Sequence, residues 1–253
     1  MSDVPVAKKK YASYENFVAE CPWCCKEIIF NRASDLRTFE PIGGRDVLCL
    51  STDCRQPFRI VGDVINSPHE MLIFDCYELV ERKHYMNCIL SLAQAYEVFF
   101  SLFFRVELLY KPFGAAPRQK LADLNRLSDK LYGKIKKYAF TDMRALFLEY
   151  MVAGRSPKNL NEAAEVVAAF PDCPREPKDA AIKRLGDAKL VPLLKAVKAT
   201  SIHTLRNRVV HNQAYRPTRE EVEEAIKETR SVLFPLTSHL QLYDEINWYM
   251  RKT

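Results

Sequence analysis

Glycine is scarce in this chain, with 7 residues in a length of 253, and this scarcity argues against a loop-rich β fold. Long apolar runs are missing as well. The longest, VFFSLFF at residues 98–104, is far too short to span a bilayer and predicts a core segment. Residues 1–17 carry three lysines but lack the apolar stretch of a secretory signal. We therefore expect a cytoplasmic protein with no membrane attachment.

Charge is present in both signs and is only moderately unbalanced. Charged residues make up 28% of the chain and hydrophobic residues 48%, which is typical of a soluble globular protein with a sizeable core. The net charge of +6 favours an anionic partner without identifying one.

Cysteine has the most uneven distribution, because five of the eight cysteines lie within 34 residues. The reducing cytosol disfavours disulfides, so a cluster of this kind indicates a metal site. Cys21 and Cys24 form the pair CPWC, and Cys49 and Cys54 form a C-x4-C pair after 24 intervening residues. Two turns that each present two thiolates suit tetrahedral Zn²⁺, so we predict these four residues as its ligands.

This cysteine-rich region resembles the zinc ribbons as a class over residues 16–66, where strand-like sequences separate the two pairs. Four protein ligands leave no open position for a water, which indicates a structural zinc and no catalytic metal. The C-x4-C pair is wider than the usual C-x2-C, and Cys25 is an alternative ligand to Cys24. Reduced thiols without a metal are the other interpretation. Five arginines of the region either contact nucleic acid or a partner, or are simply solvated: Arg32, Arg37, Arg45, Arg55 and Arg59.

The rest of the chain changes in character to helix. Residues 70–253 predict a bundle of five or six helices, whereas residues 1–15 predict a mobile, basic lead-in. Apolar residues surround most faces of 71–110, which predicts one long helix or a broken pair. The expected fold is therefore mainly α, with a small β-rich zinc ribbon at the N-terminus.

The helical boundaries are clearest near the C-terminus. Residues 188–212 predict one long helix. Thr218 and Glu221 form a T-x-x-E capping box for the helix that follows. Pro235 predicts the end of that helix and the start of a final one at 239–252.

The helix at 188–212 ends in a group of polar side chains. A helix turns by about 100° per residue, so Asn207 and His211 share a face, with His203 one turn earlier and Arg206 on the flank. RNA cleavage without a metal needs a group to deprotonate the 2′-OH and a group to protonate the leaving 5′ oxygen, and histidine suits both tasks. Arginine binds the phosphate with paired hydrogen bonds. Since one helix offers one His–Arg pair, two copies about a two-fold axis would complete a cleft.

The stretch RNRVVH, Arg206 to His211, resembles the R-x4-6-H motif of HEPN domains, in which a polar residue such as Asn often follows the Arg. A long early helix and a capped helix after the motif are similar too. The resemblance covers residues 70–253. It implies an all-α bundle that dimerises and, in many members, a metal-independent endoribonuclease that leaves a 2′,3′-cyclic phosphate. It also implies catalytic roles for Arg206 and His211 and a supporting role for Asn207.

Glu97, on the early helix, is a weaker candidate to pair with Arg206 and orient it. A different interpretation is that Arg206 and His211 only stabilise the C-terminus of a helix, where cations are favourable. His203 has a similar alternative role, as a histidine at the edge of the core.

These observations lead to three functional hypotheses. The first is a homodimeric endoribonuclease of the toxin or antiviral-defence type, with RNA as substrate and an antitoxin or sensor protein as a further partner. The second is a non-catalytic HEPN module that binds a nucleotide, RNA or a protein. The third is a zinc-ribbon nucleic-acid adaptor whose helical half is a scaffold for oligomerisation.

Overall fold

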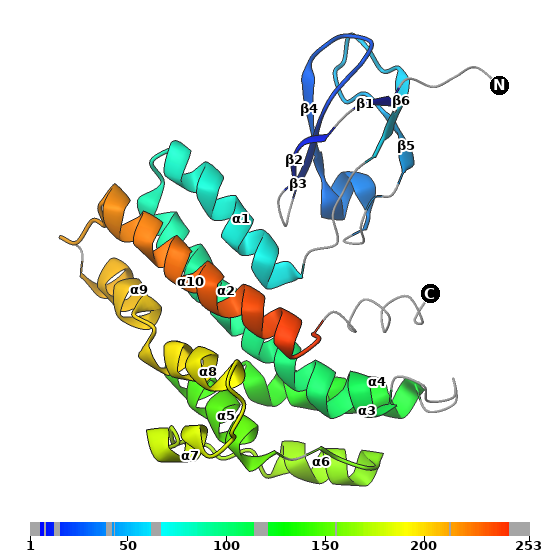
Figure 1. Ribbon diagram of the computed structural model, residues 1–253. Coiled ribbons are helices and arrows are strands. Elements are labelled where there is room, and N and C mark those ends of the chain that lie inside the picture. The colour runs from blue at the N-terminus through cyan, green and yellow to red at the C-terminus, as the bar shows by residue number, and fades with distance from the viewer. Residues whose placement is uncertain are drawn as a thin grey trace. The chain divides into compact units, whose positions relative to one another are not determined.

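The computed structural model describes residues 6–7, 9–12, 16–38, 42, 44–61, 67–113, 121–154, 156–212 and 214–242. The chain divides into two compact units, Met1–Asp75 and Cys76–Thr253. Figure 1 shows the strands gathered in the first unit and a set of packed helices in the second. The expectation of a mainly α fold is thereby confirmed.

The N-terminal unit contains two three-stranded sheets, ordered β1-β6-β5 and β2-β3-β4. The strands are β1 (Val6–Ala7), β2 (Lys9–Ala12), β3 (Asn16–Glu20), β4 (Glu27–Asn31), β5 (Arg45–Leu48) and β6 (Pro57–Ile60). β3 and β4 pair antiparallel, as do β5 and β6. We expected a mobile lead-in over residues 1–15, but β2 adds to the edge of β3 and β1 lies parallel to β6.

A small core holds this unit together. In β4 the side chains alternate, with Ile28 and Phe30 buried and Glu27 and Ile29 exposed, which is the pattern of a strand with one covered face. Phe30 packs against Phe58 of β6. Cys21 and Cys49 belong to the same buried cluster, so the core and the cysteine pairs lie next to each other. The π-helical turn η1 (Arg32–Leu36) follows β4 and is capped by the Asn31 side chain.

The helices of the chain are α1 (Pro68–Glu81), α2 (Tyr85–Arg105), the π-helical turn η2 (Val106–Tyr110), α3 (Lys111–Phe113), α4 (Leu121–Ile135), α5 (Phe140–Ala153), α6 (Leu160–Ala168), α7 (Asp179–Lys183), α8 (Leu190–Ala199), α9 (Ile202–His211) and α10 (Arg219–His239). α2 is the central helix and packs against α5, α9 and α10. Phe99, Phe100 and Phe103 of α2 surround Phe147 of α5, with ring centroids 5.7, 5.3 and 4.7 Å from it. These rings are fully buried, and each contributes about 1.5–3 kcal/mol by leaving water.

α2 also has the composition of a membrane helix. Among the described residues, the stretch Tyr85–Phe113 is the one helix long and apolar enough to cross a membrane. In the structure, 61% of its most apolar window is buried inside the protein. The central helix of a bundle passes the same test of length and hydropathy, and the contacts of α2 are of that kind.

Two predicted helical boundaries are corrected by the structure. Residues 188–212 do not form one helix, because the backbone leaves the helical conformation at Thr200, with ψ at 135°, and separates α8 from α9. α10 does not stop before Pro235 but continues to His239. Leu233 and Leu236 on either side of the proline are fully buried, and their packing outweighs one lost backbone hydrogen bond. Most of the final helix expected at 239–252 lies outside the described residues.

Other expectations agree with the structure. Residues 71–110 form a broken pair, since α1 ends near Lys83, which has a φ of 61°, and α2 begins at Tyr85. The capping box at the start of α10 is formed in both directions. The Thr218 hydroxyl accepts from the backbone N–H of Glu221, and the Glu221 carboxylate accepts from that of Thr218.

Candidate functional site

The four predicted cysteine ligands come together at two turns. The first turn follows β3, where the backbone N–H of Cys25 donates to the Cys21 carbonyl. The second follows β5, where the backbone N–H of Arg55 donates to the Ser51 carbonyl in the same way. The two turns therefore match, and Cys49 lies two residues before the start of the second one. This offset explains how a C-x4-C pair performs the task of a C-x2-C pair.

The sulfur positions fit a tetrahedral metal ion. The four Sγ atoms all lie within 4.8 Å of one another. Cys21 Sγ is 3.9 Å from Cys54 Sγ, and Cys24 Sγ is 3.8 Å from Cys49 Sγ. Zn–S bonds of about 2.3 Å in a tetrahedron require S···S separations of about 3.8 Å, whereas a disulfide requires about 2.05 Å. The four cysteines could therefore hold a metal ion such as Zn²⁺.

The electrostatics of the cluster also suit a cation. Burial raises the pKa of the Cys49 thiol to about 12, so an added positive charge is needed to keep it a thiolate at neutral pH. Burial acts on Cys21 as well, but the backbone N–H groups of Cys24 and Trp23 outweigh it and lower the pKa of the Cys21 thiol. Cys25 is exposed and stands outside the group of four, with a φ of 55°. The structure thus selects Cys24 over Cys25 as the candidate ligand.

The five arginines of the N-terminal unit differ in burial and in their contacts. Arg32 is buried, Arg45 donates to the Leu36 carbonyl, and Arg59 pairs with Asp46 at 3.2 Å. Arg37 and Arg55 are exposed. Arg45 and Arg59 are exposed as well, so four of these five arginines reach the solvent.

α9 carries the arginine, asparagine and histidine that sequence reasoning selected. Ile202 and Val209 are buried and hold the helix against its neighbours, while Asn207, Val210 and His211 are exposed. Val210 is an apolar side chain with 47% of its surface exposed, directly before His211. The exposed side of α9 therefore combines hydrogen-bonding groups, a histidine and an apolar contact point.

Arg206 is half-buried and lies between Asn207 and α2. Its guanidinium donates to the Asn207 side-chain oxygen at 3.2 Å. Partial burial raises the pKa of the Glu97 carboxyl on α2, and the positive charge of Arg206 opposes that rise. Glu97 is thus close enough to Arg206 for the two charges to attract each other, and this attraction would orient the guanidinium toward α2.

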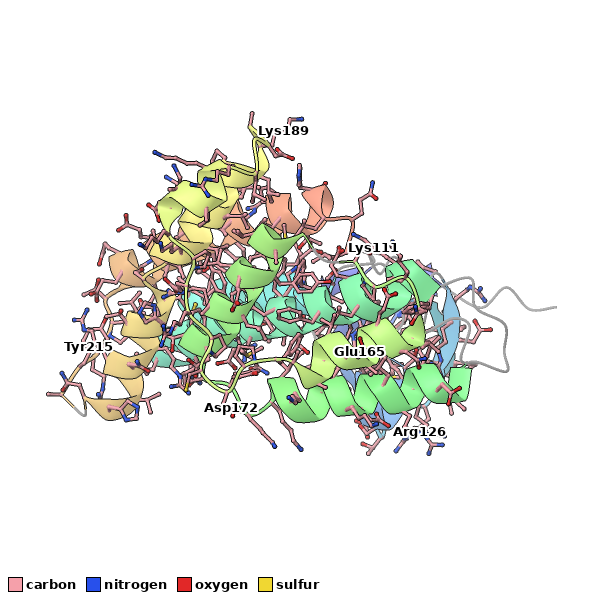
Figure 2. All side chains as sticks on the ribbon, turned by 90° about the horizontal axis from the view of Figure 1, so that it is seen from below. Lys111, Arg126, Glu165, Asp172, Lys189 and Tyr215 are labelled. Atoms are coloured by element: carbon pink, nitrogen blue, oxygen red, sulfur yellow. The ribbon has the colours of Figure 1, made fainter. Side chains whose placement is uncertain are left out.

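Arg208, two residues later, is held by a different set of contacts. Its guanidinium carbon lies 3.8 Å from the centre of the Tyr215 ring, and it pairs with Glu221 at 3.7 Å. Tyr215 lies where the chain passes from α9 to α10 (Figure 2). Arg208 therefore joins the end of α9 to the start of α10, which leaves Arg206 as the arginine suited to binding a ligand.

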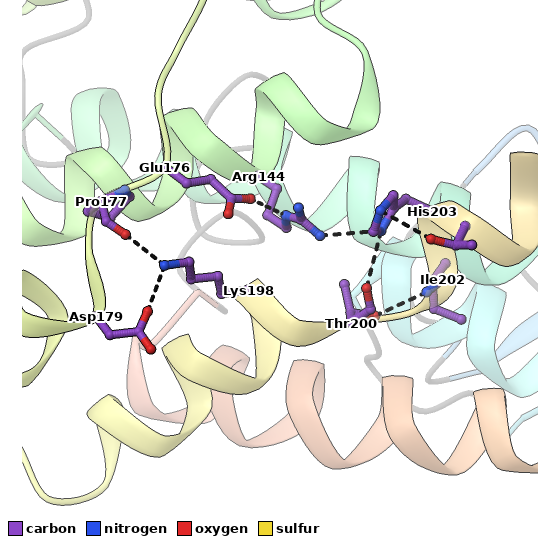
Figure 3. Close-up of polar contacts among 9 residues, drawn as sticks. Arg144, Glu176, Pro177, Asp179, Lys198, Thr200, Ile202 and His203 are labelled. Carbon is purple, nitrogen blue, oxygen red and sulfur yellow. Dashed lines mark hydrogen bonds and ion pairs between the residues drawn. The ribbon is translucent and has the colours of Figure 1, made fainter.

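His203 is directed toward the interior of the helical unit (Figure 3). Its Nδ1 lies 3.3 Å from Nη1 of the buried Arg144 and 3.1 Å from the Thr200 carbonyl, and its ring stacks on Phe140. Burial and the charge of Arg144 lower the pKa of His203. Arg144 also binds Glu176 at 2.6 Å. This network anchors His203 at the first turn of α9.

Glu228 of α10 is a residue that sequence reasoning missed. Its carboxylate accepts hydrogen bonds from the Thr200 hydroxyl, from the backbone N–H of Ser201 at 3.2 Å and from the Ser201 hydroxyl at 3.0 Å. A negative charge at the N-terminus of α9 is also favourable toward the helix dipole. Glu228 therefore fixes the break between α8 and α9, and with it the direction in which α9 points.

Comparisons with protein-family models, with curated proteins and with solved structures find no match for this chain. Function is therefore inferred from the side chains themselves.

Proposed function

We propose that the protein is a metal-independent endoribonuclease of the toxin or antiviral-defence type, whose active site is shared between two copies of the chain. The observation that carries the proposal is the end of α9, where Arg206 donates to the side chain of Asn207, His211 is exposed, and the neighbouring Arg208 is engaged elsewhere. The resemblance of residues 206–211 to the HEPN motif supports the same function.

The helix geometry favours a shared site. Arg206 and His211 are five residues apart, so their side chains leave α9 about 140° apart around its axis. One α9 cannot easily direct both groups at one phosphate. A second copy packed over the exposed Val210 would bring the His211 of one chain toward the Arg206 of the other. The proposed active form is therefore a homodimer.

Each side chain has a defined task in the proposed reaction. One His211 removes the proton from a ribose 2′-OH, and the 2′ oxygen attacks the adjacent phosphorus. The P–O5′ bond breaks, and the His211 of the other copy donates a proton to the 5′ oxygen. Arg206 binds the phosphate as its negative charge grows, while Asn207 and Glu97 orient the guanidinium. The products are a 2′,3′-cyclic phosphate and a 5′-OH end.

In this proposal the cysteine cluster has a structural task. The N-terminal unit has a small core, so a Zn²⁺ ion bound by Cys21, Cys24, Cys49 and Cys54 would supply much of its stability. The unit would then serve as a sensor, a substrate contact or a docking module for the nuclease.

The test uses full-length, zinc-loaded protein and mixed RNA in EDTA without magnesium, with the zinc content measured before and after. We expect cleavage with cyclic phosphate ends, lost by at least about a hundredfold in His211→Ala and Arg206→Ala. His84→Ala is the matched control, because His84 is an exposed histidine outside α9. Cleavage that persists equally in His211→Ala contradicts the proposal.

A mixture of wild-type protein with His211→Ala tests the shared site directly. The proposed reaction uses His211 of both copies, so a mixed dimer is inactive, and an equimolar mixture after subunit exchange should show about a quarter of the activity of the same total amount of wild-type protein. About half of that activity after confirmed subunit exchange contradicts a site that needs both histidines. RNA binding without cleavage by the wild-type protein supports the second hypothesis, a non-catalytic RNA-binding module.

A further inference from the structure

A groove lies between α1 and α10, formed by residues 77–81 of the first helix and 223–235 of the second. We call it the α1–α10 groove. Its volume is about 660 Å³. Twelve steps of 1.5 Å along α10 give that wall a length of about 18 Å, or about three turns of helix, and the α1 wall spans about one turn. An open groove whose longer wall follows about three turns of one helix suits a second helix as its ligand.

The floor of the groove is apolar. Val80 and Ile226 are buried beneath it, and Phe234 is half-buried at one side. Tyr77 leaves 44% of its surface exposed, an unusually large fraction for an aromatic side chain next to a core. A ligand for this floor must therefore bring apolar side chains of its own.

The rim of the groove has a positive side. The two acidic residues on the rim, Glu81 and Glu223, share the guanidinium of Arg219 at 3.2 and 2.7 Å. Arg230 donates to the Tyr77 hydroxyl at 3.2 Å and lies over the Phe234 ring. Within the part of the chain that the structure describes, neither Arg230 nor Lys227 forms an ion pair with a carboxylate. Two cations on the rim are thus available to a ligand.

We propose that the α1–α10 groove binds an amphipathic helix of a partner protein, with apolar side chains on the floor and carboxylates facing Lys227 and Arg230. The ring of Phe234 and the hydroxyl of Tyr77 hold the Arg230 guanidinium in place over the groove. Little side-chain freedom is then lost when a carboxylate binds it. The half-exposed rings of Tyr77 and Phe234 offer contacts to the apolar face of a helix, whereas Val80 and Ile226 are already buried. The inference does not depend on the proposed nuclease activity.

The experiment measures the affinity of full-length protein for two synthetic helical peptides of about 14 residues by fluorescence anisotropy. One peptide has leucines on one face with glutamates on both flanks, and the other has lysines in place of the glutamates. We expect the acidic peptide to bind at least about tenfold more tightly than the basic one. The double variant Lys227→Glu, Arg230→Glu should reverse this preference.

Two further variants separate the groove from the general surface. Tyr77→Ala should weaken the acidic peptide by about tenfold, because it removes an exposed part of the floor. Arg126→Glu is the matched control, since Arg126 is an exposed arginine on α4 that does not line the groove, and its replacement should leave the affinity unchanged.

Any one of four outcomes would overturn the proposal. Equal binding of both peptides contradicts the proposed charge complementarity. A preference for the acidic peptide that persists in the double variant Lys227→Glu, Arg230→Glu contradicts it as well. A chain ending at Leu242 that binds the acidic peptide much more tightly than the full chain identifies residues 243–253 as the occupant. A dimer in light scattering that dissociates on Arg230→Glu identifies a second copy instead.

Discussion

Replacement of Glu228 by glutamine tests whether long-range contacts hold α9 in position. Glu228→Gln keeps the size of the side chain but leaves one acceptor oxygen in place of two and removes the charge. The Thr200 hydroxyl and the two donors of Ser201 then compete for that oxygen. We expect the first turn of α9 to open more often, while the core around α2 stays unchanged.

The size of the effect follows from the contacts. A hydrogen bond to a charged acceptor contributes about 1.5–3 kcal/mol, and the exposed position of Ser201 favours the lower end. Loss of one such bond corresponds to about 1.5 kcal/mol, or roughly a tenfold increase in the opening equilibrium of α9. The helix dipole adds a few tenths of a kcal/mol in the same direction.

Native-state amide hydrogen exchange measures this opening directly. The informative amides are Thr204 and Leu205, both of which donate to the Ser201 carbonyl in the first turn of α9. Their exchange should become about tenfold faster in Glu228→Gln, and that of α5 amides should not change. Glu224→Gln is the control, because Glu224 is an exposed carboxylate on the same helix. Equal acceleration in both variants, or none in either, would refute the role given to Glu228.

The remaining predictions concern the metal and the response to pH. Purified protein should contain about one Zn²⁺ per chain by elemental analysis, and Cys49→Ser should lose it while Cys25→Ser retains it; equal loss in both variants contradicts the choice of ligands. Because the pKa of His203 is lowered in the folded protein, the unfolded chain binds its proton more readily, so stability is full above the ordinary histidine pKa and falls with the pH below it. Urea unfolding between pH ~7.5 and ~5.5 should show this loss of stability in the wild type and in His84→Gln, and a smaller loss in His203→Gln. An identical pH dependence in all three proteins would contradict the role given to His203.

Features that depend on neighbouring residues could be predicted from the sequence. The capping box at Thr218 needs only two side chains three residues apart, and both of its hydrogen bonds are formed. The strands β4, β5 and β6 could be located because apolar runs and turn residues are local signals, whereas β1 and β2 form where a mobile lead-in was expected. The cysteine pairs are another local signal, and the four sulfurs do come together.

Features that depend on distant residues could not be predicted. The break at Thr200 has no local cause as strong as a proline or glycine, and it depends on Glu228, which is 28 residues away in the sequence. Pro235 was wrongly predicted to end a helix, because the sequence does not show that Leu233 and Leu236 are buried against other helices. In both places tertiary contacts decided the outcome against the local preference.

His203 shows the same limit at the level of the candidate site. Its spacing from Asn207 predicted a common face, which a straight helix provides. Both residues do lie in α9, but the sequence does not show that the imidazole contacts the buried guanidinium of Arg144 and the ring of Phe140. A histidine with a lowered pKa beside an arginine is poorly suited to receive a proton, so the chemistry that we propose falls on His211 alone.

Reliance on His211 alone raises the importance of the second copy. Cleavage by 2′-OH attack needs a group that takes a proton and a group that gives one, and a single chain offers one suitable imidazole at the end of α9. Glu97 does not replace it, because the carboxyl group of Glu97 interacts with the positive charge of Arg206. The elements that fix α9, namely Glu228 at its start and Arg208 with Tyr215 at its end, leave the side bearing Asn207, Val210 and His211 exposed. On this reasoning, a variant that remains folded but monomeric should be inactive even with every α9 side chain intact.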